Sequence, residues 1–290
     1  MKKLFDFLFA KVDFLLSRFV FGNAAGTKQN IYGILELWNS RRKFTGGRVN
    51  KQSNVLAKNV DDLGFCKAKW HYDHSMISNL RNNLKNSIKK GDTFKSFDSQ
   101  GNLANQRMKD AVGENKLVRK LVNEHLKSDL FAYFQSHFKV FYPICWRQYP
   151  ISNTDIKRNV YSNLWHCDSG KTSIITAFIL LADVTENNGP TNIISKQDTK
   201  KALSMGYINR DNYGKSKNFF KNEADIFKCT GKAGSIFYLN TRECLHKAGE
   251  ISKGHHRDVM MLTFYPIPGK KIEWDQKEIT QSKSLNWYRY

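Results

Sequence analysis

The length and charge of the chain limit the kind of protein it can be. Its 290 residues can enclose one large core, and 47 Lys and Arg against 26 Asp and Glu give a formal net charge of +21. Five cysteines, an odd number without a Cys-x-x-Cys pair, argue against a disulfide framework and indicate a reducing compartment. The basic excess favours an anionic partner such as nucleic acid, anionic lipid or a phosphorylated or acyl-carrier substrate, and a solvated basic surface is the equal alternative.

The first 53 residues are predicted to form an extension. Residues 2–21 carry apolar side chains along one side of a helix, but Asp6, Lys11 and Asp13 interrupt them too often for a signal peptide or a membrane span. Such a helix packs on the protein's own core or, as the alternative, lies on a membrane surface or a partner. A second helix is predicted over 30–44 and a linker over 45–53. We therefore expect an amphipathic helical extension (1–53) and a main domain (54–290), in a cytoplasmic protein that could also be peripheral to a membrane.

The next part of the chain is predicted to be helical with loops. His71 and Asp73 form a His-x-Asp pattern, which we interpret as structural because Asp73 suits the N-cap of a helix over 76–84. A loop is predicted over 92–113. A long helix is predicted over 115–138, with its apolar side formed by Leu117, Leu121, Leu126, Leu130 and Phe134.

From residue 140 onward the pattern changes to short strands. Strands are predicted over 140–149, 172–181, 234–240 and 258–265, with Pro143 marking an edge or a bulge. Because helices do not alternate with these strands, the fold is predicted to be mainly β, a sandwich or jelly roll. The polar segment 195–228 interrupts the strands. Two interpretations fit it equally well: a lid or substrate-recognition element at the mouth of the barrel, or a surface loop with one short helix.

One stretch among these strands has the chemistry of a metal site. His166 and Asp168 are two residues apart, so in an extended backbone they point to the same side, with Cys167 facing the other way. A third ligand, His246, follows 78 residues after Asp168, and Arg257 comes 11 residues later at the start of a strand. Two His and one carboxylate with open positions form the ligand set of non-haem Fe(II) oxygenases, and an Arg can hold a dicarboxylate co-substrate. The alternative for Arg257 is a solvated basic group with its histidine neighbours.

These segments together resemble the Fe(II)- and 2-oxoglutarate-dependent dioxygenases of the phytanoyl-CoA dioxygenase-like family. The resemblance implies a double-stranded β-helix (jelly roll) with flanking α-helices, Fe(II) held by His166, Asp168 and His246, and 2-oxoglutarate held by Arg257. It also implies O2 as co-substrate and ascorbate as reductant. The resemblance covers roughly residues 58–268 and rests on Trp-His-Cys-Asp at 165–168, Asp-Val-Thr-Glu-Asn-Asn-Gly-Pro at 183–190, Ala-Gly-Ser-Ile-Phe-Tyr-Leu-Asn at 233–240, Leu-His at 245–246 and His-Arg at 256–257.

The predicted function follows from this resemblance. Asp168 stands where related halogenases have a small residue, so hydroxylation of a small organic substrate is favoured, and the basic charge favours an anionic or acyl- or lipid-linked one. The alternative is an inactive jelly roll that binds nucleic acid or a membrane surface through its charge and its first helix. That alternative has no need of a complete triad and arginine.

Overall fold

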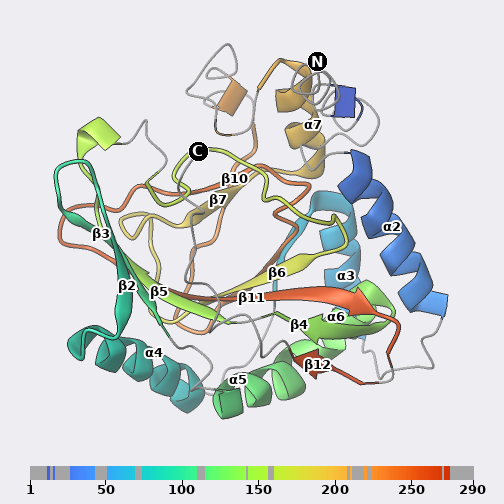
Figure 1. The fold of residues 1–290 in the computed structure, drawn as a ribbon, viewed down its shortest axis with the longest axis horizontal. Helices are drawn as coiled ribbons and strands as arrows, with labels where there is room; N and C mark the ends of the chain where they lie inside the picture. The colour runs from blue at the N-terminus through green and yellow to red at the C-terminus, as the bar shows by residue number, and fades with distance from the viewer. Residues whose placement is uncertain are drawn as a thin grey trace, which may run out of the picture.

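Two β-sheets face each other in the computed structural model (Figure 1). The structure describes residues 12–13, 16, 27–42, 51–68, 74–109, 115–141, 143–155, 160–207, 210, 219–220, 224–269 and 271–274. The larger sheet has the strand order β1-β9-β6-β11-β5-β3-β2, with β4 paired to β11 and β12 paired to β4. The smaller sheet has the order β10-β7-β8. The bounds in the larger sheet are β1 Phe65–Lys67, β2 Thr93–Phe97, β3 Leu103–Met108, β4 His137–Val140, β5 Ile144–Gln148, β6 Ile175–Leu180, β9 Ile236–Leu239, β11 Arg257–Ile267 and β12 Glu273–Trp274. Those in the smaller sheet are β7 Thr191–Ile193, β8 Phe227–Lys228 and β10 His246–Ala248.

Strand β6 shows how the sequence builds a core on each side of the larger sheet. All of its six residues are buried, because both faces of the strand are covered. Ile175, Ala177 and Ile179 face the helices outside, whereas Phe178 and Leu180 face the smaller sheet. The inner core between the sheets also contains Ile193 from β7 of the smaller sheet, and Phe237, Leu239 and Val259 from the larger sheet.

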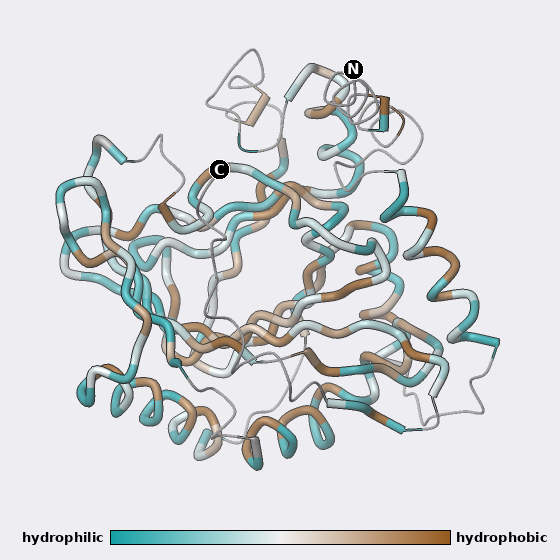
Figure 2. The backbone as a smooth tube through the Cα atoms, viewed as in Figure 1, coloured by the Kyte–Doolittle hydropathy of each residue, from teal (hydrophilic) through white to brown (hydrophobic). Residues whose placement is uncertain are grey.

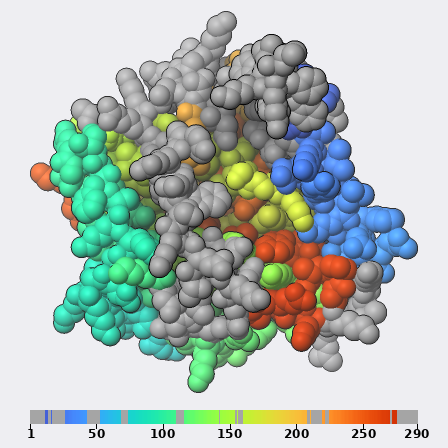
Figure 3. All heavy atoms as spheres, in the orientation of Figure 1, coloured from blue at the N-terminus to red at the C-terminus, as the bar shows by residue number. Residues whose placement is uncertain are grey.

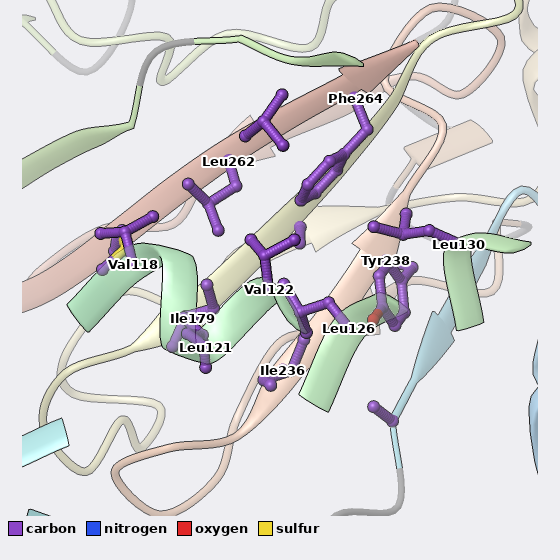
Figure 4. Packing of buried hydrophobic residues seen from close by; sticks show 14 of the residues in the cluster. Val118, Leu121, Val122, Leu126, Leu130, Ile179, Ile236, Tyr238, Leu262 and Phe264 are labelled. Atoms are coloured by element: carbon purple, nitrogen blue, oxygen red, sulfur yellow. The ribbon is translucent and has the colours of Figure 1, made fainter. Parts of the chain in front are cut away.

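Helices cover the outer face of the larger sheet. They are α3 (Lys51–Leu63), α4 (His74–Lys89) and a continuous helical segment made of α5 (Asn115–Leu121), a π-helical turn (Val122–Leu126) and α6 (Lys127–Phe134). Their hydrophobic sides turn toward the sheet (Figure 2). Figure 4 shows this packing, in which Leu121, Val122, Leu126 and Leu130 meet Ile179, Ile236, Tyr238, Leu262 and Phe264. Each such fully buried side chain contributes roughly 1.5–3 kcal/mol to stability.

The helix predicted over 115–138 is confirmed but ends earlier. Gln135 adopts a left-handed conformation with φ of 49° and its N–H donates to the carbonyl of Phe131, which closes the helix after Phe134. The chain then enters β4, where Phe138 pairs with Pro266 of β11. Phe138 is fully buried in the sheet, and this burial stabilises the strand more than its helix propensity would stabilise a longer helix.

The loop predicted over 92–113 is wrong for most of its length. Residues 93–97 and 103–108 form the β2–β3 hairpin, closed by a turn in which Asp98 accepts the backbone N–H groups of Gln100 and Asn102. Strand β3 is held in the sheet by backbone pairing with β5. Backbone pairing does not require apolar side chains, so the polar hairpin left no hydrophobic signal in the sequence.

Two further boundaries differ from the predictions. Helix α3 begins at Lys51, so residues 51–53 belong to a helix and not to the predicted linker. The single strand predicted over 140–149 is two strands, β4 and β5, separated around Pro143, because Pro lacks the N–H that an unbroken ladder needs. Inside the segment 195–228 the structure describes helix α7 (Lys196–Ser204) with Ser195 as its N-cap.

Helix α2 (Thr27–Arg42) confirms the second predicted helix and packs beside the metal motif. Its Glu36 accepts from Lys171 Nζ at 2.6 Å and Ser173 Oγ at 2.8 Å. Gly33 permits this contact, since a Cβ there would lie 2.6 Å from Thr172 Oγ1 and 3.0 Å from Ser173 N. The opposite side of α2 is exposed on the flank of the molecule (Figure 3).

Several predictions fall outside the described residues. These are nearly all of the helix over 2–21, the linker residues 45–50, and His71 with Asp73. The division at residue 53 and the cytoplasmic or membrane-peripheral location stay predictions. Among the helices that the structure describes, none combines the length and the apolar character that crossing a bilayer requires.

Candidate metal centre

A short backbone bridge brings the two predicted histidine ligands together. His166 N donates to the carbonyl of His246 at 3.0 Å, and His246 N donates to that of His166 at 2.9 Å. This antiparallel bridge extends the smaller sheet beyond β10 and sets the two rings side by side, with their centroids 4.2 Å apart. Two segments 80 positions apart in the sequence numbering thereby present imidazoles to one point.

Asp168 completes the triad as its spacing predicts. Its N–H donates to the carbonyl of Thr241 at 2.8 Å, which holds the carboxylate beside the histidines. Asp168 Oδ1 lies 3.6 Å from His166 Nε2 and 3.8 Å from His246 Nε2. Cys167 points the other way, into a buried cluster with Trp165.

The histidine rings are oriented as metal ligands are. Nδ1 of His166 lies 2.8 Å from the carbonyl of Leu164, and Nδ1 of His246 lies 3.2 Å from that of Cys244. Each Nδ1–H can therefore donate to a carbonyl, which leaves the Nε2 lone pairs directed at the Asp168 carboxylate. Burial lowers the pKa of His166 to about 3 and also lowers that of His246, so both rings are neutral at physiological pH.

The three donor atoms fit a single ion. Burial raises the pKa of Asp168, but its electrostatic interactions with the neighbouring histidines and Arg242 and a hydrogen bond with Thr241 lower it to about 2, so the carboxylate is ionised. Two ligands that bind one ion at about 2.1 Å can be at most about 4.2 Å apart, and both distances from Asp168 Oδ1 are shorter. Within the described parts of the chain, this is the group of His, Cys, Asp and Glu side chains that could hold a metal ion.

Arg257 is buried beside this centre and is not a solvated basic group. It is 3% exposed and opens β11 on the inner face of the larger sheet. Its guanidinium donates to Gln148 Oε1, to the carbonyl of Gly189 and to Thr191 Oγ1. Thr191 pairs in register with Ala248, two residues after His246, which places Arg257 near the triad.

The charge of Arg257 is not neutralised by the protein that surrounds it. Its hydrogen bonds go to neutral acceptors, and no carboxylate of the described residues forms an ion pair with it. Burial lowers its pKa to about 10, so it still carries its proton at neutral pH. A buried cation without a counter-ion is costly, and an anionic ligand would remove that cost.

Sequence reasoning missed three residues around Arg257. Gln148 and Thr191 hold the guanidinium, and Tyr161 lies close enough for the Arg257 charge to affect its pKa, which burial raises to about 12. The Tyr161 hydroxyl is buried and has no hydrogen-bond partner in the described structure. The period-two pattern of strand 140–149 could have indicated Gln148, but Tyr161 lies in a polar loop with no such signal.

Comparison with known proteins identifies the fold. No protein-family model matches the chain, and no curated protein matches it. Solved structures do match: SnoK, a non-heme alpha ketoglutarate dependent carbocyclase from nogalamycin biosynthesis, has a TM-score of 0.56 at 11% identity over 81% of this chain and 93% of its own. The fold is that of the 2-oxoglutarate-dependent oxygenases.

Two other matches support the same conclusion. SnoN, an alpha ketoglutarate dependent epimerase, has a TM-score of 0.54 at 14% identity over 73% of this chain and 82% of its own. EctD from S. alaskensis, solved with 2-oxoglutarate and 5-hydroxyectoine, has a TM-score of 0.53 at 12% identity over 77% and 79%. The predicted jelly roll with flanking helices is therefore confirmed. These enzymes include an epimerase and a carbocyclase, so the shared fold does not by itself specify hydroxylation.

Proposed function

We propose that the chain is an Fe(II)- and 2-oxoglutarate-dependent dioxygenase of the phytanoyl-CoA dioxygenase-like type that hydroxylates a small organic substrate. One observation carries the proposal: two neutral imidazoles and an ionised carboxylate converge on one point, beside a buried arginine that forms no ion pair with any described residue. A metal and a dicarboxylate would satisfy all four groups at once.

Each residue has a distinct role in this proposal. His166, Asp168 and His246 would hold Fe(II) through two imidazole nitrogens and one carboxylate oxygen. Arg257 binds the far carboxylate of 2-oxoglutarate, and Gln148 and Thr191 fix the direction of its guanidinium. When bound, Fe(II) with 2-oxoglutarate and O2 supplies the oxidising chemistry, and ascorbate keeps the iron reduced.

The alternative, an inactive jelly roll that binds through surface charge, does not account for Arg257. Keeping an uncompensated charge buried costs stability, and a protein that acts only through its surface gains nothing from it.

Formation of succinate from 2-oxoglutarate under air, with Fe(II) and ascorbate, tests the proposal without knowledge of the substrate. We expect iron-dependent succinate from the wild type and none above background from His166→Ala or Arg257→Ala. His255→Ala is the matched control, because it removes an exposed histidine two residues from Arg257. If the wild type forms no succinate and binds neither Fe(II) nor 2-oxoglutarate in anaerobic titrations, the enzyme proposal is wrong and the binding-protein alternative takes its place.

A further inference from the structure

A second arginine, Arg242, lies beside the metal centre and has no role in the scheme above. It follows β9 in the turn that leads to β10, directly after Thr241, whose carbonyl holds the backbone of Asp168. Its Nη1 donates to Thr176 Oγ1 and to Thr241 Oγ1, both at 2.8 Å. Thr241 links Arg242 to the metal centre, because its carbonyl accepts from Asp168 N–H and its Oγ1 accepts from Arg242 Nη1, each at 2.8 Å.

The guanidinium of Arg242 points into the space between the two sheets. Thr176 alternates along β6 with Ile175 and Ala177, which face the outer helices, and so shares the inner face with Phe178 and Leu180. A group that donates to Thr176 Oγ1 therefore lies at the inner surface of the larger sheet. Arg242 remains partly exposed, so a ligand in this space can reach it.

Among the described residues, no carboxylate forms a hydrogen bond or an ion pair with Arg242. Its two hydrogen bonds go to hydroxyls, and its Nε is buried with no hydrogen-bond partner in the part of the chain that the structure describes. The carboxylate next to it in sequence, Glu243, instead pairs with Lys196 at 2.8 Å and accepts from Asn240 at 2.7 Å. Burial lowers the pKa of Arg242, as expected for a cation that has lost water without gaining a full counter-ion.

A count of charges identifies Arg242 as the surplus cation of the site. A divalent metal, the Asp168 carboxylate, a dianionic 2-oxoglutarate and Arg257 together sum to zero formal charge, on the assumption that the proposed function holds. Arg242 then remains, and Arg210, whose backbone N–H donates to the carbonyl of Trp165 at 3.0 Å next to His166, adds a second positive charge. The fully loaded site would thus still attract an anion.

We propose that Arg242 binds an anionic group of the substrate, a carboxylate or a phosphate, and holds the substrate next to the metal. The planar guanidinium offers Nη2 to the ligand, while Nη1 stays fixed by the two threonine hydroxyls and Nε is buried. This inference deepens the proposed function by naming the chemical class of the substrate. A small acid or a phosphorylated compound fits the site, and a neutral hydrocarbon does not.

Binding of simple anions tests the proposal, with inorganic phosphate and acetate as the probes. Phosphate is titrated calorimetrically into wild type, Arg242→Gln, Arg242→Lys and Arg42→Gln, in the presence of Mn(II) and 2-oxoglutarate. Arg42→Gln is the matched control, because it removes one positive charge from the exposed end of α2. We expect Arg242→Gln to weaken binding at least about 10-fold, Arg242→Lys to weaken it less, and the control to bind as the wild type does. Acetate measured in the same way shows whether the site prefers a carboxylate or a phosphate.

A second readout places the anion relative to the metal. Mn(II) in the triad should enhance the 31P relaxation of bound phosphate in the wild type, and the enhancement should disappear in Arg242→Gln. His166→Ala, which disrupts the metal site, should still bind phosphate in the calorimeter if Arg242 is the anchor. Thermal unfolding of each variant confirms that it is folded.

The outcomes separate this proposal from the proposed function. Equal phosphate binding by wild type and Arg242→Gln overturns it, as does binding that is lost in His166→Ala but kept in Arg242→Gln, which would mean that phosphate binds the metal. Absence of phosphate and acetate binding to the wild type also overturns it. If the wild type fails to bind Mn(II), the proposed function is wrong, whereas Arg242-dependent phosphate binding would still support the anion site.

Discussion

Arg257 and Asp258 are consecutive residues of β11, both buried, and their surroundings differ completely. Asp258 faces the helices, where Arg147 binds it through two nitrogens at 2.6 Å and 2.7 Å and Arg81 Nε lies at 3.3 Å. Arg257 faces the smaller sheet and meets neutral acceptors. The same strand thus carries Asp258, whose charge is paired within the fold, and Arg257, whose charge is available to a ligand. Because β-strand side chains alternate, a single step along the chain separates the structural ion pair from the candidate site.

The same contrast distinguishes stability from function. Removing one partner of a buried ion pair leaves the other charge buried without a partner, so the free energy of unfolding decreases. Removing a cation that forms no ion pair should change the free energy of unfolding little and should weaken ligand binding instead. The predictions below test this division, beginning with the largest effect.

The largest effect is expected from the metal ligands. Asp168→Ala should lower the affinity for Fe(II) or Mn(II) by more than about 100-fold, since losing a direct ligand costs more than changing a residue that only orients one. Metal titration monitored by electron paramagnetic resonance of Mn(II) measures this. Cys167→Ala lies between two ligands but faces the other way, and should retain wild-type affinity. Equal loss in both variants would mean that the segment, and not the carboxylate, matters.

Asp258→Asn should be the most damaging change to stability. It breaks a paired, fully buried carboxylate and should lower the free energy of unfolding by about 3 kcal/mol. Arg257→Gln, one residue away, should change it by less than about 1 kcal/mol, because the lost charge had no counter-ion. Urea denaturation of the two variants compares them directly. A larger loss in Arg257→Gln would contradict the division between the two faces.

Arg257→Lys should separate co-substrate binding from folding. Lysine keeps the charge but lacks the planar fork, so we expect the Kd for 2-oxoglutarate to rise about 10- to 100-fold with an almost unchanged free energy of unfolding. Calorimetric titration under anaerobic conditions measures the Kd. An unchanged Kd would show that another group binds the carboxylate.

The pairing of Asp258 also predicts a dependence on pH. Burial raises its pKa, but the hydrogen bonds and charge of Arg147 lower it more, so the folded-state pKa lies well below the unfolded value of about 3.9. The stabilisation is therefore fully present above about pH 4 and is lost as the pH falls below it. The difference in unfolding free energy between wild type and Asp258→Asn should stay constant from about pH 7 to about pH 5 and shrink at lower pH. A constant difference down to about pH 2 would exclude this origin.

The smallest effect is expected from Tyr161→Phe. Its hydroxyl has no partner in the described structure, so its loss should change the free energy of unfolding by less than about 1 kcal/mol. If the hydroxyl turns to the carboxylate beside Arg257, the Kd for 2-oxoglutarate should rise a few-fold, about 1 kcal/mol or less. Ala248→Ser, in the same small cluster, offers a neighbouring control in which a hydroxyl is added.

Local patterns in the sequence were enough to predict that His166 and Asp168 lie on one side, and to predict most helices, whereas His246 and Arg257 were added by their order along the chain and by the family resemblance. A His-x-Asp spacing places two ligands on one side of an extended segment, and the apolar positions of residues 115–134 place one face of a helix against a core. These properties depend on the periodicity of the backbone, which is the same in every fold. They could therefore be deduced before any contact was known.

What only the tertiary structure decided depends on partners distant in the chain. The β2–β3 hairpin exists because β5 pairs with it, and Phe138 leaves the helix because β11 offers it a place in the sheet. The burial of Arg257, its lack of a counter-ion and the direction of Arg242 arise in the same way, since each is set by strands and turns that meet across the barrel. The sequence does not show whether a charged residue of a strand is paired, because only the groups that surround it in space determine this.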